Sequence, residues 1–397
     1  MKIRAVFPAG NLIAMLVSVS PFSASHAALE QFDPYAYARV LYDSNLFRRD
    51  SNEEDETIGY LGAGVNADWK LSRQHLLLDA VVARAKYDKN DQLDHTMIDA
   101  TGNWDWQVGN LWSGKLGYRY ENKLSSFNQR LITDKDMRTT QTGFLNAGYQ
   151  IHPDWRLVAG AELKDVSYQE RKRLDRDAYA GILEVQYQNT LNTRVGVRGK
   201  YTKNDLKEDN INGVSIDNDF DVTDISGVFY WEGTAKSALE ASVGYVDVSY
   251  NDNNIDTIDR DFNGVSYRAI YHWVHSEKTK IDVEAWREPS SLNDEITDYV
   301  LAQGVSVSPI WRVTEKVSLV AKLLYNNDDF KARNDISSAL GAQRRDDDTW
   351  LFQINANWDP RQYLRLSMGY TKENRDSSID ERDFDDNQVE AKALFKF

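Results

Sequence analysis

The stretch LWSGKLGYRYENK, residues 111–123, alternates between two kinds of side chain. Trp112 and Leu116 fall on one face of an extended chain, whereas Lys115 and Arg119 fall on the other. Successive side chains of a β-strand point to opposite faces, so this pattern predicts a strand with one apolar and one charged face.

The same alternation recurs along the whole chain after the N-terminal region. Further clear examples are DWRLVAGAELK (154–164), TRVGVRGKY (193–201), VSYRAIYHW (265–273) and WLFQINANW (350–358). Counting such segments predicts an all-β chain of about eighteen strands, and an even number places both ends of the chain on the periplasmic side of a bacterial barrel.

The connections between these segments alternate in length. Short connections are predicted near residues 70–74, 107–110, 151–154, 189–192, 232–237, 275–280, 313–316 and 359–362. The intervening connections are long and acidic, as in RRDSNEEDE at residues 48–56. Short turns at one end and long polar loops at the other predict an antiparallel, up-and-down β-barrel of the outer-membrane type.

Composition agrees with a barrel and excludes several other classes. The chain has 397 residues, a net charge of -15 and no cysteine, which removes disulfides, thiol catalysis and cysteine-ligated metals. No apolar stretch reaches the length of a membrane-spanning helix, but barrel strands need only one apolar face. The acidic balance argues against nucleic-acid binding, and no cofactor-binding fingerprint is present.

The first residues have the pattern of a secretory signal peptide. Lys2 and Arg4 precede a short apolar core, and Ser25 and Ala27 form a small-x-small cleavage site. The sequence therefore predicts a signal peptide over residues 1–27 and a transmembrane barrel over 28–397. The alternative is an N-terminal membrane anchor, for which the apolar run is short.

Tryptophans lie beside the predicted short turns, which indicates a periplasmic aromatic girdle. The alternative is a soluble β-sandwich, but a sandwich would not need loops that are long at one end only. The girdle residues are Trp69, Trp106, Trp112, Trp155, Trp231, Trp273, Trp311 and Trp358.

The chain ends EAKALFKF, residues 390–397. Alternation places Phe395 and Phe397 on the lipid-facing side of the last strand and Lys392 in the lumen. A terminal aromatic at this position is typical of the signal read by the outer-membrane assembly machinery, so we expect that machinery and outer-membrane lipid as partners.

Alternation also predicts which charged residues line the lumen. Eighteen strands enclose an aqueous channel unless a segment plugs it, and no plug domain is predicted, although a long loop can fold inward. The cations expected along a substrate pathway are Lys115, Arg119, Arg156, Lys164, Arg194, Arg198, Arg268, Lys322 and Arg365, and the inward acids are Asp99, Asp105, Glu121, Glu162, Glu184, Glu240, Asp282, Glu284 and Glu390.

The cations cluster on residues 111–123, 154–164 and 193–202, which are alternate strands of one wall. A ladder of cations in a wet lumen lowers the barrier for an anionic solute. The alternative is that each cation pairs with a neighbouring acid and merely stiffens the wall.

Motifs for catalysis or metal binding are weak. The mature histidines show no metal-ligand spacing, and no serine lies in a nucleophile elbow. Asp217, Asp219 and Asp221 begin like a calcium loop, but Val222 and Val228 stand where that loop needs glycine and glutamate. The sequence therefore predicts neither an enzyme nor a specific metal site.

The order of several segments resembles one family along essentially the whole mature chain. These segments include DPYAYARVLYDSNLFR (33–48), WKLSRQHLLLDA (69–80), RDFNGVSYRAIYHW (260–273) and DDNQVEAKALFKF (385–397). The chain is similar to the EpsL-type outer-membrane β-barrel proteins of exopolysaccharide biosynthesis and exosortase-type systems, which are grouped with β-barrel porins. The resemblance implies a role in moving exopolysaccharide across the outer membrane of a Gram-negative bacterium, and it implies no catalytic residues.

The sequence thus favours a passive conduit for an anionic polysaccharide, fed by periplasmic export components. Inward Tyr230 and Trp286 would offer stacking surfaces to sugars. Three alternatives stay open. One is a general diffusion porin, the second is a structural or adhesive barrel whose acidic loops bind matrix, and the third is an outer-membrane hydrolase or lipid-modifying enzyme.

Overall fold

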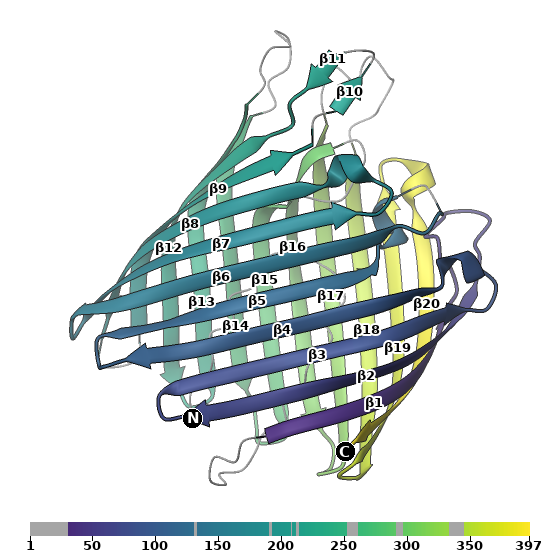
Figure 1. The fold of residues 1–397 in the computed structure, drawn as a ribbon, viewed down its shortest axis with the longest axis horizontal. Coiled ribbons are helices and arrows are strands. Elements are labelled where there is room, and N and C mark those ends of the chain that lie inside the picture. Colours follow the sequence, from purple (N-terminus) through teal and green to yellow (C-terminus); the bar gives the residue numbers. More distant parts are fainter. Residues whose placement is uncertain are drawn as a thin grey trace.

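A computed structural model describes residues 31–130, 133–189, 193–207, 209–211, 214–251, 261–290, 297–332 and 345–397. The predicted signal peptide, residues 1–27, lies outside these residues. The described chain forms one closed antiparallel barrel of 18 strands, in which the first strand pairs with the last. Figure 1 shows the barrel from the side, with the C-terminus at the end that carries the short turns.

The predicted strand number is confirmed. The first half of the barrel consists of β1 (Gln31–Asp43), β2 (Glu56–Leu71), β3 (Gln74–Tyr87), β4 (His95–Val108), β5 (Trp112–Leu124), β6 (Met137–His152), β7 (Trp155–Tyr168), β8 (Arg176–Gln188) and β9 (Thr193–Leu206). The second half consists of β12 (Phe220–Thr234), β13 (Ser237–Tyr250), β14 (Phe262–Val274), β15 (Thr279–Ser290), β16 (Thr297–Arg312), β17 (Val317–Ala332), β18 (Asp346–Arg361), β19 (Leu364–Ser377) and β20 (Phe384–Lys396).

Smaller elements lie only in the connections at the extracellular end. Strands β10 (Asp209–Ile211) and β11 (Val214–Ile216) form a hairpin between β9 and β12. Four 3-10 turns cap other loops, namely η1 (Asp91–Leu93), η2 (Phe127–Gln129), η3 (Lys172–Leu174) and η4 (Asp380–Arg382). Among the described residues, no helix is long and apolar enough to span a membrane.

Seven of the eight predicted short turns are confirmed at the periplasmic end, and the eighth, predicted at 189–192, lies largely outside the described residues. The predicted girdle tryptophans all lie near this end, on the outer face of the wall. Trp112 stacks against Tyr149 of β6 with 4.6 Å between ring centroids, and Trp155 packs against Tyr187 of β8 at 5.3 Å. These amphipathic rings mark the periplasmic edge of the apolar band.

The extracellular edge of the band is marked by tyrosines on the outer face. In each case the hydroxyl donates to a polar side chain on the next strand, two residues further toward the extracellular end than the tyrosine's direct partner. The pairs are Tyr118–Gln141 (2.8 Å), Tyr201–Asp221 (2.8 Å), Tyr325–Asp348 (2.6 Å) and Tyr370–Asn387 (2.8 Å). Such a tyrosine keeps its ring in lipid and its hydroxyl at the polar boundary.

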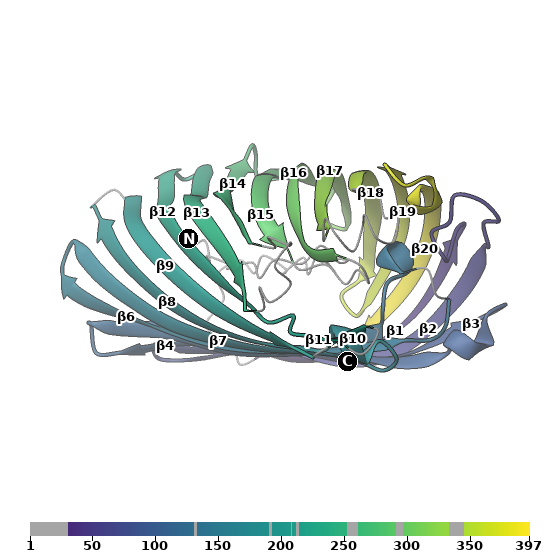
Figure 2. The ribbon, with the colours of Figure 1, turned by 90° about the horizontal axis from the view of Figure 1, so that it is seen from above.

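The barrel is flattened in cross-section. Figure 2, seen from the extracellular end, shows one broad wall that includes β3–β9 and an opposing wall that includes β13–β18. Along both walls successive side chains alternate between the lumen and the outer face, as the geometry of a strand requires. The backbone groups pair within the closed sheet, as a membrane-spanning strand needs.

Candidate channel and its extracellular mouth

The strand register fixes which side chains line the lumen, because directly opposed residues of neighbouring strands lie on the same face. Arg119 of β5 opposes Thr142 of β6, which opposes Lys164 of β7. Exposed apolar residues such as Leu116 and Tyr118 occupy the opposite, lipid-facing positions. By this register the structure places all nine predicted cations, and all nine predicted acids, on the inner face.

Charges of the two signs are not mixed evenly around the inner face. We call the inner face of β5–β9 the basic wall. Its cations are Lys115, Arg119, Lys123, Arg138, Arg156, Lys164, Arg176, Arg194, Arg198 and Lys200, whereas its acids are only Glu121, Glu162 and Glu184.

The neighbouring strands have the opposite bias. We call the inner face of β1–β4 the acidic wall. Its acids are Asp33, Asp43, Glu56, Asp68, Asp79, Asp99 and Asp105, and its permanent cations are Arg39 and Lys70. The two walls meet between β4 and β5, so the potential along the inner face changes sign at this boundary.

Four of the nine predicted cations are ion-paired. Lys115 lies 3.5 Å from Asp105, and Arg119 lies 3.1 Å from Asp99 and 2.8 Å from Glu121. The other two paired cations, Arg268 and Arg365, lie outside the basic and acidic walls. Arg268 contacts Glu284 and Glu288, and Arg365 lies 2.7 Å from Asp359. The contacts of these four residues agree with the alternative in which each cation pairs with a neighbouring acid and stiffens the wall.

The other five predicted cations are Arg156, Lys164, Arg194, Arg198 and Lys322. In the part of the chain that the structure describes, none of them has a carboxylate oxygen within 4.0 Å. Four of the five lie on β7 and β9, so the basic wall retains positive charge that its own acids do not neutralise.

Neutral groups position three of these guanidinium groups against the wall. Arg156 donates to the hydroxyl of Ser113 on β5 at 2.9 Å, and Arg198 donates to that of Ser226 at 3.4 Å. Arg194 lies over the ring of Tyr230 at 4.6 Å from its centroid, so Tyr230 faces the lumen as predicted, but its ring is covered.

Gly148 makes room for the Arg156 side chain. A Cβ at this position would lie 2.2 Å from the Arg156 Nε and Nη2 atoms. The guanidinium therefore crosses β6 directly over the glycine backbone to reach β5. Trp286 also faces inward as predicted, but it is buried at 6% exposure against Gly304 and offers little surface for stacking.

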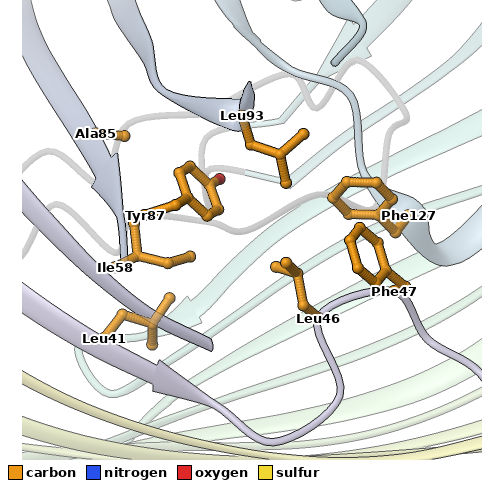
Figure 3. Packing of buried hydrophobic residues seen from close by; sticks show 8 residues of the cluster. All are labelled: Leu41, Leu46, Phe47, Ile58, Ala85, Tyr87, Leu93 and Phe127. Atoms are coloured by element: carbon orange, nitrogen blue, oxygen red, sulfur yellow. The ribbon is translucent and has the colours of Figure 1, made fainter. Parts of the chain in front are cut away.

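The extracellular mouth contains a hydrophobic cluster that the alternation does not predict. Leu46 and Phe47 of the loop after β1 and Phe127 of η2 pack over inward-facing Ile58 and Tyr87 (Figure 3). The rings of Phe47 and Phe127 meet edge to face at 4.9 Å. Two loops are therefore folded into the mouth and held there by burial of apolar surface.

Polar contacts tie the first of these loops, residues 44–55, to the barrel. Arg48 lies 3.0 Å from Asp43 of β1 and 2.9 Å from Asp386 of β20. Asn45 donates to the carbonyl of Asp385 at 3.1 Å. The loop is thus fixed across the closing seam of the barrel.

The loop between β5 and β6 reaches much further. Asn128 of η2 donates to Glu373 of β19 at 3.1 Å, and Arg375 of β19 donates to the Asn128 carbonyl. Strands β20 and β1–β4 separate β5 from β19 along the wall. The described part of this loop therefore leaves its own strands and reaches β19 across part of the mouth. We call these two contacts the latch.

Arg130 follows η2 and lies over the Phe127 ring at 3.9 Å. Burial lowers the pKa of Arg130 to about 10, with repulsion from Arg171 as a secondary cause. The group still carries its charge at neutral pH, so the crossing loop adds a cation to the mouth.

The sequence contains a signal for this hydrophobic cluster that strand alternation does not capture. Leu46, Phe47 and Phe127 are large apolar residues inside connections that are otherwise polar. Such residues in a long loop often indicate that the loop packs on something.

The aspartates of the incomplete calcium-loop motif, and inward-facing His272, make ordinary local contacts. Asp217 accepts from the Asp219 amide, Asp219 accepts from the Leu206 amide, and Asp221 accepts from Tyr201 on the outer face. Inward-facing His272 lies 2.8 Å from Asp282. Among the described residues, no three His, Asp or Glu side chains are grouped so that they could hold a metal ion.

The terminal aromatics lie as predicted. Phe395 and Phe397 are 45% and 81% exposed on the outer face, and the Phe397 amide donates to the Pro34 carbonyl at 3.0 Å. Their recognition by assembly machinery stays a prediction.

Comparisons with known proteins agree with the barrel. The family profile described as “Putative beta-barrel porin 2” matches residues 32–397. OccK2 (OpdF) of Pseudomonas aeruginosa superposes with a TM-score of 0.50 at 10% identity, covering 94% of this chain and 100% of that chain. A BenF-like porin of Pseudomonas fluorescens Pf-5 gives a TM-score of 0.48 at 7% identity over 92% and 99% of the two chains. A search of curated proteins found no match.

Proposed function

Because the chain belongs to the family described as “Putative beta-barrel porin 2”, it is a porin-like outer-membrane barrel, and we propose that it passes small anionic solutes by passive diffusion. This role needs no catalytic residues, in agreement with the expectation that the chain is not an enzyme.

The observation that carries the proposal is the uncompensated charge of the basic wall. Lys164, Arg194 and Arg198 line the lumen without a carboxylate partner among the described residues. Positive side chains along a wet pore lower the electrostatic barrier for an anion and raise it for a cation.

The mouth favours small solutes over a polymer. Two loops occupy part of the opening, and the latch joins η2 to β19. A polysaccharide that threads through the barrel would need a clear path, whereas a monosaccharide acid needs only a narrow one.

Export of an anionic exopolysaccharide is the second candidate. The sequence resemblance to EpsL-type proteins supports it, and the basic wall would suit acidic sugars equally well. In this candidate, periplasmic export components deliver the polymer, and η2 with its latch contacts must leave the mouth.

Liposome swelling with the refolded barrel tests the two candidates against each other. We expect galacturonate to enter faster than galactose, and an acidic oligogalacturonate of many units to be excluded. Entry of the oligomer would favour the export candidate. Equal entry rates of galacturonate and galactose would contradict a preference for anions. Absence of swelling would favour a closed, structural barrel.

Two lysines of β9 provide a matched pair of variants. Lys200 faces the lumen and Lys203 faces outward, where it pairs with Asp205 at 2.7 Å. We expect Lys200→Gln to slow galacturonate relative to galactose, and Lys203→Gln to leave the ratio unchanged. An equal change in both variants would contradict a pathway along the basic wall.

A further inference from the structure

The extracellular half of the basic wall holds the densest group of cations in the described lumen. Three of them share one acid. Glu121 lies 2.8 Å from Arg119, 2.7 Å from Lys123 and 3.2 Å from Arg138. Asp99 adds one further contact to Arg119 at 3.1 Å. Glu121 and Asp99 are therefore already engaged by these three cations.

Two more cations lie beside this group with no acid of their own. Lys164 directly opposes Thr142, and Arg176 directly opposes Val166. In the described structure neither side chain has a carboxylate oxygen within 4.0 Å. The nearest acid in sequence on this face, Glu162, lies 4.0 Å from Lys200.

The register makes Lys164 and Arg176 diagonal neighbours on adjacent strands. Such positions have Cα atoms about 7–8 Å apart, and long side chains from them can reach a common ligand. Arg138 of β6 opposes Tyr168 of β7, one inward position beyond Val166, so it lies across β7 from Arg176. The Arg138 Nε and Tyr168 hydroxyl are buried without hydrogen-bond partners in the described structure.

Cations held this close repel one another, and the repulsion is relieved when an anion binds between them. A single carboxylate would neutralise one of the two free cations. A solute with two anionic groups would neutralise both, and charge-assisted hydrogen bonds to lysine and arginine are the strong ones.

We propose that Lys164 and Arg176, with Arg138 beside them, form a binding site for a solute that carries two anionic groups, such as a small dicarboxylate. This site rests on the proposed function for its access, since the solute must first enter the lumen. The inference extends the proposed function, because it assigns a preference for dianions over monoanions to one site on β7 and β8.

The rest of the basic wall differs from this site. Arg156, Arg194 and Arg198 each have a neutral partner, namely Ser113, Tyr230 and Ser226. These three guide anions along the wall, whereas Lys164 and Arg176 hold them.

The test measures block of the chloride current through single refolded channels by adipate and by hexanoate. The two probes have the same number of carbons and differ in their number of carboxylates. We expect adipate to block at a concentration about tenfold below that of hexanoate, which corresponds to about 1.4 kcal/mol.

The double variant Lys164→Gln/Arg176→Gln should raise the half-blocking concentration of adipate about tenfold and leave that of hexanoate nearly unchanged. The charge-preserving variant Lys164→Arg/Arg176→Lys should keep the adipate block, and it separates loss of charge from a folding defect. As a matched control, Arg84→Gln/Lys203→Gln removes the same charge from outward-facing positions and should not alter the block.

Equal block of the wild-type channel by adipate and hexanoate would overturn this inference, as would a control variant that loses adipate block as strongly as the site variant. If the channel is still anion-selective in a salt gradient, only the dianion site fails. If it is not anion-selective, the proposed function itself fails.

Discussion

The acidic wall and the basic wall lie side by side and have the same alternation of faces, but they use their charges differently. Most acids of β1–β4 are committed to neighbouring groups. Glu56 accepts from the Thr57, Lys89 and Asn90 amides, and Asp43 pairs with Arg48. On the basic wall, by contrast, half of the cations keep no carboxylate partner in the described structure, namely Arg156, Lys164, Arg176, Arg194 and Arg198.

The net charge of a lumen wall therefore does not by itself indicate the role of that wall. The acids of β1–β4 hold loops and neighbouring strands in place, so their charge is largely used within the protein. The cations left over on β7–β9 remain available to a solute. We therefore expect substitutions in the basic wall to change selectivity and substitutions in the acidic wall to change stability.

The largest effect is expected from charge reversal on β9. Arg194→Glu/Arg198→Glu should lower the ratio of chloride to potassium permeability about tenfold, because it replaces attraction for anions by repulsion. Reversal potentials in a potassium chloride gradient measure this ratio. The outward-facing control Lys86→Glu/Lys203→Glu should leave it unchanged, and an equal shift in the control would erase the contrast between lumen and surface.

A substitution in the acidic wall should change stability and leave selectivity nearly unchanged. Glu56 is fully buried and also accepts from the Asp88 amide and the Asn90 side chain. Glu56→Gln should lower the free energy of unfolding by about 1–3 kcal/mol, because buried amides lose a charged acceptor. Urea unfolding of the detergent-solubilised barrel measures this change. Asp79→Asn serves as the control and should have little effect, because this inward carboxylate has no hydrogen bond or ion pair among the described residues. A large change of selectivity in Glu56→Gln would contradict the structural role of the acidic wall.

The latch links the basic wall to the far side of the barrel through Asn128. Asn128→Ala removes the hydrogen bond to Glu373 and should loosen the crossing loop. We expect single-channel conductance to rise, up to about twofold, because conductance follows the open width of the pore. Unchanged conductance would mean that the narrowest point lies elsewhere.

The smallest effect is expected from Gly148→Ala. The new methyl group would push the Arg156 side chain away from β6 and break its contact with Ser113. The charge stays in the lumen, so the permeability ratio should change less than about twofold. A change as large as that of the β9 reversal would show that the position of Arg156, and not only its charge, controls permeation.

The sequence predicts the faces of the barrel well because the side-chain period of a strand is two and a misplaced strand would expose charges to lipid. Arg119 and Arg198 could be assigned to the lumen for this reason alone. The terminal Phe395 and Phe397 could be placed in the same way.

The sequence does not predict which inward charges pair. Arg198 directly opposes Glu184, but Glu184 accepts instead from Gln186 at 2.5 Å. Arg268 pairs with Glu288 of β15 at 2.6 Å. The choice depends on strand tilt and on competing donors, which alternation does not contain. The hydrophobic cluster at the extracellular mouth is not predicted for a related reason. The contact between Phe47 and Phe127 joins two loops that are far apart in sequence.

The reversal potential of the wild-type barrel in a potassium chloride gradient tests the central claim most directly. We predict a potential of the sign that anion selectivity gives, and we expect this potential to move toward zero in Arg194→Gln/Arg198→Gln. A potential of the opposite sign, or one that this variant leaves unchanged, would contradict the claim that the unpaired cations of the basic wall govern passage.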